Sequence, residues 1–164
     1  MTANNEQLPS WLRFRDEESE RNFGLAMAGD VNEFGFRPMV AINAPAPGIG
    51  KTWLARHILG SRYGSARTCL PPSTERQWER MLCACQVDGY LFVDDVPAPL
   101  VSDRLARFLT AKKWQSPWLE DGETVMLDVD VQVVVAGNHL RLSDDLSRRS
   151  IWIHLAGEGR KSRR

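Results

Sequence analysis

Residues 45–52 read PAPGIGKT and end in Gly50, Lys51 and Thr52, which match the close of the pattern G-x-x-x-x-G-K-[ST]. In this pattern glycines let successive backbone N–H groups turn inward on an anion, and the N-terminus of the following helix adds partial positive charge. Pro45 stands at the first glycine position and lacks an N–H. Because the inner N–H groups come later in the loop, the segment still predicts a phosphate-binding loop.

The reactive side chains of this loop predict a nucleoside triphosphate and its metal ion. Lys51 is expected to reach the β- and γ-phosphates of ATP, and the Thr52 hydroxyl to bind Mg²⁺. The alternative is a glycine-rich turn that only caps a helix, but an apolar strand before the loop and a helical pattern after it favour the phosphate site. The predicted ATP-binding residues are Pro47, Gly48, Ile49, Gly50, Lys51, Thr52 and Trp53.

An acidic pair, Asp94 and Asp95, follows the apolar run YLFV at residues 90–93. A carboxylate at such a strand end can hold the metal shell, and the next acid can polarise an attacking water. We assign Asp94 to Mg²⁺ and Asp95 to the water. The alternative is an acidic turn before Pro97 without a catalytic role.

Three later polar residues complete the candidate site. Asn138 ends an apolar run, where its amide can hold the γ-phosphate or orient the water; an ordinary Asn in a tight turn is the alternative. Arg148 and Arg149 can reach a neighbouring subunit's γ-phosphate, or form a surface ion pair with Asp144 or Asp145, and the sequence does not choose between these. The predicted catalytic residues are Lys51, Asp94, Asp95, Asn138, Arg148 and Arg149.

These residues need elements that bring them together. The candidate strands are residues 39–42, 66–70, 90–93, 131–136 and 151–155. Their alternation with helical patterns predicts an α/β fold with a five-stranded, mainly parallel sheet covered by helices on both faces, so that strand ends share one edge. One helix is expected over residues 51–60, ending at Gly60, and another has Val101 on its apolar face.

The domain organisation is expected to have three parts. Residues 1–35 form a helical N-terminal extension, residues 36–156 the core without a large lid, and residues 157–164 a basic disordered tail. Within the core, a turn around Gly122 suggests a hairpin.

Composition limits the function classes. The 164 residues carry 21 Lys and Arg against 21 Asp and Glu, so binding to nucleic acid must use local patches. Three cysteines without a CxxC pair predict a reduced setting. The chain has neither a signal-peptide pattern nor a run of the ~20 apolar residues that a membrane span needs. We therefore expect a cytoplasmic protein without membrane association.

Lys112 and Lys113 precede Trp114, a combination that suits weak contact with single-stranded DNA. Core packing of Trp114 is the favoured alternative. The acidic turn around Gly122 lacks a basic tip, which weakens the interpretation as a translocating motor. The basic tail can hold a DNA backbone or simply solubilise the chain.

Residues 36–155 resemble the helicase-type AAA+ ATPases of phages, plasmids and viruses, especially superfamily III helicase domains and phage primase–helicase ATPase domains. The matching segments are APAPGIGKT, YLFVDD, VVVAGNHLRLSDDLSRRSIWIHL and, more loosely, FLTAKKWQSPWLEDGE. The resemblance implies a three-layer P-loop NTPase fold, ATP and Mg²⁺, ring-like homo-oligomers and DNA as the substrate.

The same resemblance implies that Asn138 is the sensor and that the arginine pair Arg148 and Arg149 includes an intersubunit finger. We expect an ATP-hydrolysing, helicase-type domain of a phage or mobile element that acts in DNA replication in the cytoplasm of a bacterial host cell. Two alternatives stay open: a nucleotide switch that loads or recruits a replication protein without unwinding, and an interaction protein that joins another ATPase assembly. Hydrolysis stimulated by single-stranded DNA is typical of a motor, whereas slow, DNA-insensitive hydrolysis is typical of a switch.

Overall fold

A computed structural model describes residues 8–64, 66–116 and 125–157 of the chain. The strands are β1 (Met39–Ala44), β2 (Thr68–Cys69), β3 (Tyr90–Val93), β4 (Lys113–Ser116), β5 (Val125–Asp128), β6 (Gln132–Asn138) and β7 (Ser150–His154). The helices are α1 (Glu17–Ala28), α2 (Lys51–Tyr63), α3 (Glu75–Ala84), α4 (Asp103–Phe108) and α5 (Asp144–Ser147).

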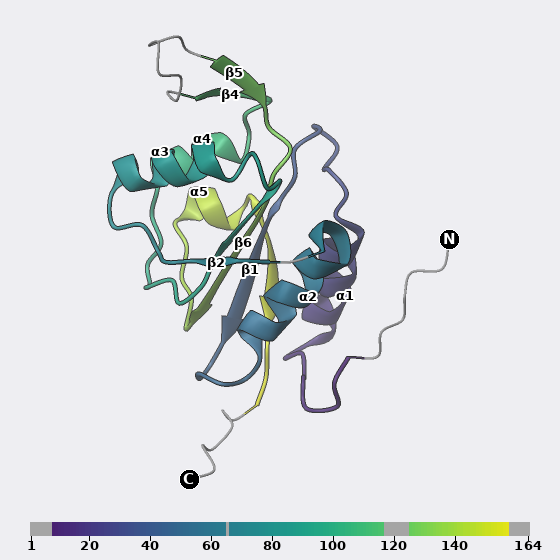
Figure 1. Cartoon of the computed structure of the whole chain (residues 1–164). Helices are drawn as coiled ribbons and strands as arrows, with labels where there is room; N and C mark the ends of the chain where they lie inside the picture. The colour runs from purple at the N-terminus through teal and green to yellow at the C-terminus, as the bar shows by residue number, and fades with distance from the viewer. Residues whose placement is uncertain (1–7, 65, 117–124, 158–164) are drawn as a thin grey trace.

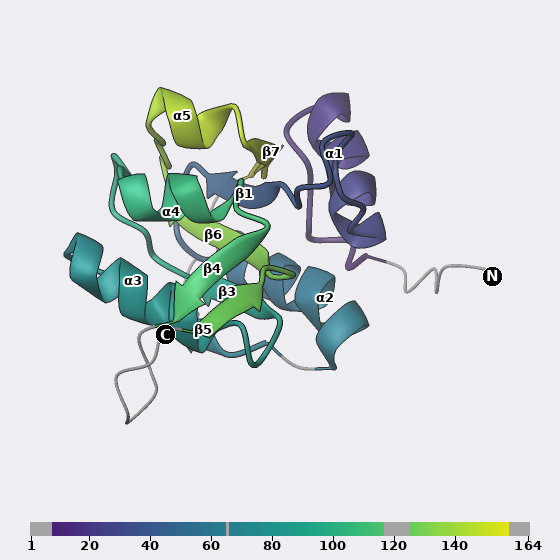
Figure 2. The same cartoon turned by 90° about the horizontal axis from the view of Figure 1, so that it is seen from above.

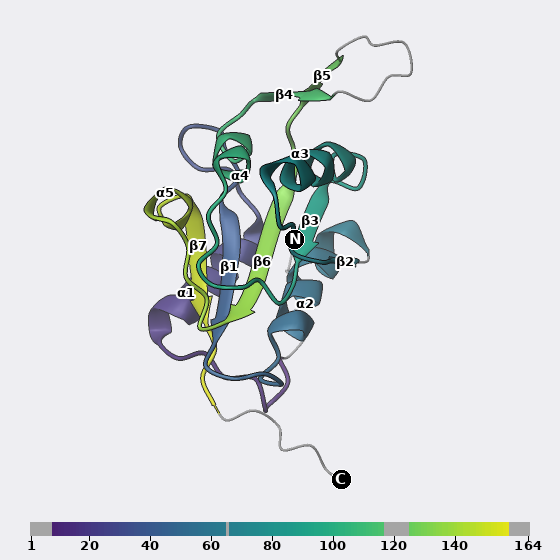
Figure 3. The same cartoon turned by 90° about the vertical axis from the view of Figure 1, so that its left-hand side faces the viewer.

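The main sheet has five strands in the order β2-β3-β6-β1-β7, and every pairing is parallel (Figure 3). This confirms the predicted five-stranded α/β sheet. β1 lies between β6 and β7, with Ala44 beside Asn138 and Asn43 beside His154. The carboxyl ends of β1, β3 and β6 therefore meet at one edge, where the loop to α2 begins (Figure 1).

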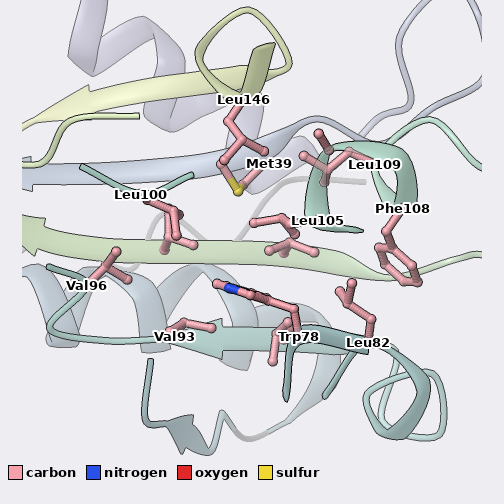
Figure 4. Close-up of a cluster of buried hydrophobic side chains, with 14 of the residues drawn as sticks. Met39, Trp78, Leu82, Val93, Val96, Leu100, Leu105, Phe108, Leu109 and Leu146 are labelled. Carbon is pink, nitrogen blue, oxygen red and sulfur yellow. The ribbon is translucent and has the colours of Figure 1, made fainter. Parts of the chain in front are cut away.

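Helices cover both faces of the sheet and bury two apolar layers (Figure 2). Alternate residues of β1 enter opposite layers: Ile42 faces α1 and α2, whereas Met39 packs with the layer under α3, α4 and α5 (Figure 4). Leu105 and Phe108 of α4 are almost fully buried in that second layer. Burying one such side chain contributes roughly 1.5–3 kcal/mol, so the core fixes the strand ends on which the polar residues sit.

Helix α1 closes the free edge of β7. Asp16 caps the helix by accepting a hydrogen bond from the Ser19 N–H at 2.8 Å. The Ser19 hydroxyl accepts from the His154 N–H at 3.0 Å, and the Asn22 amide donates to the Trp152 carbonyl at 2.8 Å. Side chains of α1 thus take the place of a further strand, and they tie the N-terminal segment to the sheet.

Two local expectations changed. Gly60 does not end its helix: α2 continues to Tyr63, because Gly64 supplies the left-handed C-cap at φ 76°. Val101 is 61% exposed and precedes α4, because the Ser102 hydroxyl caps that helix. The antiparallel strands β4 and β5 form the two-stranded hairpin that the sequence suggested; the expected turn around Gly122 lies outside the described residues, as do residues 158–164 of the predicted tail. In the described part of the chain, no helix has the length and apolar character to cross a bilayer.

Candidate nucleotide-binding site

The loop between β1 and α2 leaves a helix N-terminus open. Gly48 and Gly50 adopt positive φ angles of 77° and 117°, which are accessible to glycine and costly for other residues. Gly50 is the N-cap of α2, and its position provides no side-chain cap. The first N–H groups of the helix therefore lack a side-chain acceptor and carry the positive end of the helix dipole, as an anion site requires.

Lys51 is buried, with 6% of its surface exposed. Its Nζ donates to Asn138 Oδ1 at 2.5 Å. Burial lowers the pKa of Lys51, and the negative charges of Asp94 and Asp95 partly oppose that change. A cation in such surroundings is stabilised by a charged partner, and an anion at the open helix terminus would be one.

The Thr52 hydroxyl donates to Asp94 Oδ2 at 2.5 Å. Thr52 and Asp94 are both half-buried. One hydroxyl and one carboxylate beside a phosphate-binding loop are the hard oxygen donors that Mg²⁺ prefers, since this ion uses one or two protein oxygens together with phosphates and water. The two residues therefore fit the metal role predicted for them.

Asp95 follows in a left-handed conformation with φ 52°, and its N–H donates to Asp94 Oδ1 at 2.9 Å. Its side chain is exposed. The next residue, Val96, donates its N–H to the Ala136 carbonyl at 2.9 Å. A Cβ at Gly137 would lie 2.8 Å from the Val96 carbonyl oxygen, so only glycine lets the acidic loop approach β6 this closely.

The structure brings Lys51, Thr52, Asp94 and Asn138 into direct contact as two hydrogen-bonded pairs, with Asp95 adjacent in the chain. They come from the first turn of α2, from the residue after β3 and from the end of β6. The parallel sheet collects these ends at one edge, which is where ligands bind in open α/β sheets.

Arg148 and Arg149 lie at the other end of the strands, beside the first residue of β1. Arg149 accepts a backbone hydrogen bond from Met39, the first residue of β1, whereas the phosphate loop follows Ala44. The length of β1 separates them by roughly 17 Å at ~3.3 Å per residue. Arg148 and Arg149 both pair with Asp145 Oδ1, which is the ion pair considered as their alternative role, and these bonds lower the pKa of Asp145.

Lys112 and Lys113 also lie away from the loop, at the base of the β4–β5 hairpin (Figure 1). Lys113 Nζ lies 3.8 Å from Asp128 Oδ1 across the hairpin. Trp114 packs edge-on against Phe108, with ring centroids 5.2 Å apart. Its ring thus belongs with the core, as the favoured alternative held.

Sequence reasoning missed Trp11. A Cβ added at Gly50 would lie 2.5 Å from Cζ3 of Trp11, so this ring rests on the phosphate loop. Trp11 also meets Trp53 edge-on, with centroids 5.7 Å apart, while Trp53 stacks on His57 at 4.9 Å. The sequence shows Trp11 beside other apolar residues, Leu12 and Phe14, and nothing in that pattern linked it to Gly50.

Comparison with known proteins gives a match in structure alone. No protein-family model matches the chain, and no curated protein matches its sequence. The crystal structure of NtrX from Brucella abortus in complex with ATP is similar over 93% of this chain and 39% of its own, with a TM-score of 0.53 and 14% identity. The NtrX complex with ADP is similar over 84% and 34%, with a TM-score of 0.50 and 16% identity.

The RuvB Holliday junction branch migration motor from Thermotoga maritima is similar over 85% of this chain and 45% of its own, at 17% identity and a TM-score of 0.49. The chain thus spans between 34% and 39% of the two NtrX chains. Identities at this level show the fold alone. With its β2-β3-β6-β1-β7 parallel sheet, this chain has the α/β fold of AAA+ P-loop ATPases.

Proposed function

We propose that this chain binds ATP with Mg²⁺ and hydrolyses it. The observation that carries the proposal is Lys51, a cation with 6% exposure that donates a hydrogen bond to the neutral amide of Asn138, beside a helix N-terminus without a side-chain cap. A buried positive charge and open N–H groups at one place suit a phosphate chain. The carboxylate of Asp94 accepts a hydrogen bond from Thr52, and Asp95 is the next residue, so that carboxylates for a metal ion and a water are at hand.

Each residue then has one task. Lys51 and the N–H groups of residues 48–52 bind the β- and γ-phosphates, and Thr52 and Asp94 hold Mg²⁺, which neutralises phosphate charge when bound. Asp95 accepts a proton from the water that attacks the γ-phosphorus, and the bond to the β–γ bridging oxygen breaks. Asn138 orients the γ-phosphate or that water. Because a carboxylate on the short Asp95 side chain has less reach than one on Glu, we expect slow turnover.

Titration of ATP·Mg²⁺ into the Lys51→Ala variant tests the phosphate site. We expect binding to be lost, while Lys113→Ala, a matched change at the distant hairpin, binds as the unaltered protein does. Circular dichroism on both variants verifies that they are folded. An ATP affinity in Lys51→Ala equal to that of the unaltered protein would contradict the proposal.

We further propose that the active form is a ring-like homo-oligomer. The support is geometric: with roughly 17 Å of strand between the phosphate loop and the arginine pair, Arg148 or Arg149 can reach a γ-phosphate only on another copy. Arg148 is the more exposed of the two, with 72% of its side chain accessible against 28% for Arg149.

The finer role, a helicase-type motor in phage or mobile-element DNA replication, rests on the resemblance of sequence motifs. A second candidate is a nucleotide switch that loads or recruits a replication protein. It is favoured by the hairpin, where Lys113 pairs with Asp128 and Trp114 packs on Phe108, so that Lys112 is the lysine left for DNA among the described hairpin residues. ATPase rates with and without single-stranded DNA, together with the particle mass, separate the two: stimulation supports the motor, and its absence supports the switch.

A further inference from the structure

Asn43 belongs to β1 and lies between the neighbouring strands β6 and β7. It is half-buried, and it stands in register with Gly137 of β6 and His154 of β7. Its Oδ1 accepts a hydrogen bond from the Leu140 N–H at 2.8 Å, and its Nδ2 lies 3.2 Å from Nδ1 of His154. One side chain therefore joins the last strand to the turn that follows Asn138.

That turn has an uncommon backbone. His139, directly after Asn138, has φ 50°. A non-glycine residue in this region costs on the order of 1–3 kcal/mol and persists only where its surroundings hold it. Two hydrogen bonds to β1 do so here: the His139 N–H donates to the Ala44 carbonyl at 3.0 Å, and the Leu140 N–H donates to Asn43. The second depends on a side chain and can be removed by mutation.

The orientation of the Asn43 amide follows from its partners. The Leu140 N–H can only donate, so it must face the oxygen, and the amide nitrogen must face His154. Nδ1 of His154 is then the acceptor and carries no proton. Burial and the positive charge of Arg15 lower the pKa of His154, against the opposing charges of Asp16 and Glu18. Trp152 stacks on the imidazole with centroids 5.4 Å apart, which fixes the ring that orients the amide.

We propose that Asn43 is a positioning residue for ATP hydrolysis. Its side-chain oxygen binds the Leu140 N–H and so holds the turn in the conformation in which the Asn138 side chain meets Lys51. His154 in turn fixes the orientation of the Asn43 amide. The side chain of Asn43 makes its hydrogen bonds to Leu140 and His154, neither of which is assigned to the phosphates or to Mg²⁺. Loss of its acceptor should therefore misplace Asn138 and lower kcat, while the loop that binds ATP stays intact. This inference rests on the function proposed above.

The test compares Asn43→Leu with Asn43→Asp. Leucine has a similar size but no acceptor, whereas aspartate keeps an oxygen for the Leu140 N–H. We expect Asn43→Leu to lower kcat roughly ten- to a hundredfold, as a small misplacement of a catalytic group does, with KM within about twofold of the unaltered protein. Asn43→Asp should keep kcat within about threefold, because the acceptor is what matters.

Asn22→Leu is the matched control, since it removes one side-chain hydrogen bond to β7 and none to the turn; its kcat should not change. Equal kcat in Asn43→Leu and the unaltered protein overturns the inference, and so does an Asn43→Asp variant as slow as Asn43→Leu. If Asn43→Leu does not fold, Asn43→Ser, which is too short to reach Leu140, takes its place. An unaltered protein without ATPase activity contradicts the proposed function instead, so the two failures are distinguishable.

Discussion

Gly50→Ala should destabilise the protein even without nucleotide. Gly50 has φ 117°, and a side chain at positive φ costs about 1–2 kcal/mol. The new Cβ would also lie 2.5 Å from Cζ3 of Trp11 and 3.0 Å from Cδ1 of Leu12, so the indole must move. Trp11 is 43% exposed, so just over half of it is buried. Exposing all of that, roughly 100 Å² at ~25 cal/mol/Å², would cost about 2.5 kcal/mol.

Because the ring can retain part of its contact, we expect Gly50→Ala to lower the free energy of unfolding by about 2–4 kcal/mol. Urea unfolding followed by far-ultraviolet circular dichroism measures this, and it avoids a fluorescence signal that depends on Trp11. In a Trp11→Ala background the clash with the indole is gone and only the 3.0 Å contact with the flexible end of Leu12 is left, so the same glycine substitution should cost little beyond the backbone strain, about 1–2 kcal/mol.

Two results would refute the reasoning. A loss below about 0.5 kcal/mol, the range of ordinary surface substitutions, would show that the loop does not hold Gly50 at positive φ. Equal losses in both backgrounds would show that Trp11 does not press on the loop.

Four further outcomes are expected. Asp95→Asn should bind ATP normally but stop turnover, and normal phosphate release by this variant would reject its role with the water. Ser102→Ala should lower the free energy of unfolding by about 1–2 kcal/mol, because it removes the cap of α4; an unchanged urea midpoint would contradict this. Arg148→Ala subunits mixed with Lys51→Ala subunits should lose the turnover that a trans arginine supports, and unchanged rates in the assembled particle would exclude that arginine. The folded protein holds the pKa of His154 below the ordinary 6.5, so the unfolded chain takes up the proton first. Stability present above pH 6.5 should thus be lost as the pH falls through the lowered pKa, less steeply in His154→Gln; equal slopes in urea titrations at several pH values would show otherwise.

The sequence predicted those parts of the site that depend on neighbours in the chain. The phosphate loop is a continuous segment, and the apolar runs before Asp94 and Asn138 are long enough to indicate strands by themselves. Parallel strands then require these residues to share one edge. The fold and the grouping of Lys51, Asp94 and Asn138 could therefore be expected before any coordinates.

The remaining features depend on contacts between distant segments. Asn43 meets Leu140 and His154 across 97 and 111 residues, and no local pattern encodes such a pairing. Likewise, two glycines could end α2, and the local pattern did not distinguish Gly64, which adopts the left-handed conformation, from Gly60. The sequence offered Arg148 two roles, and an ion pair seen within one copy does not exclude a contact with a second copy.

The two edges of the main sheet constrain how copies of this chain can meet. At one edge, Ser19 and Asn22 of α1 already occupy backbone groups of β7. At the other edge β2 consists of two residues, too few to template a partner strand. Neither edge of the main sheet therefore favours pairing with a strand of a second copy. Copies of this chain that meet at these two edges would join through side chains on helices and loops, and their contact would not lengthen the main sheet.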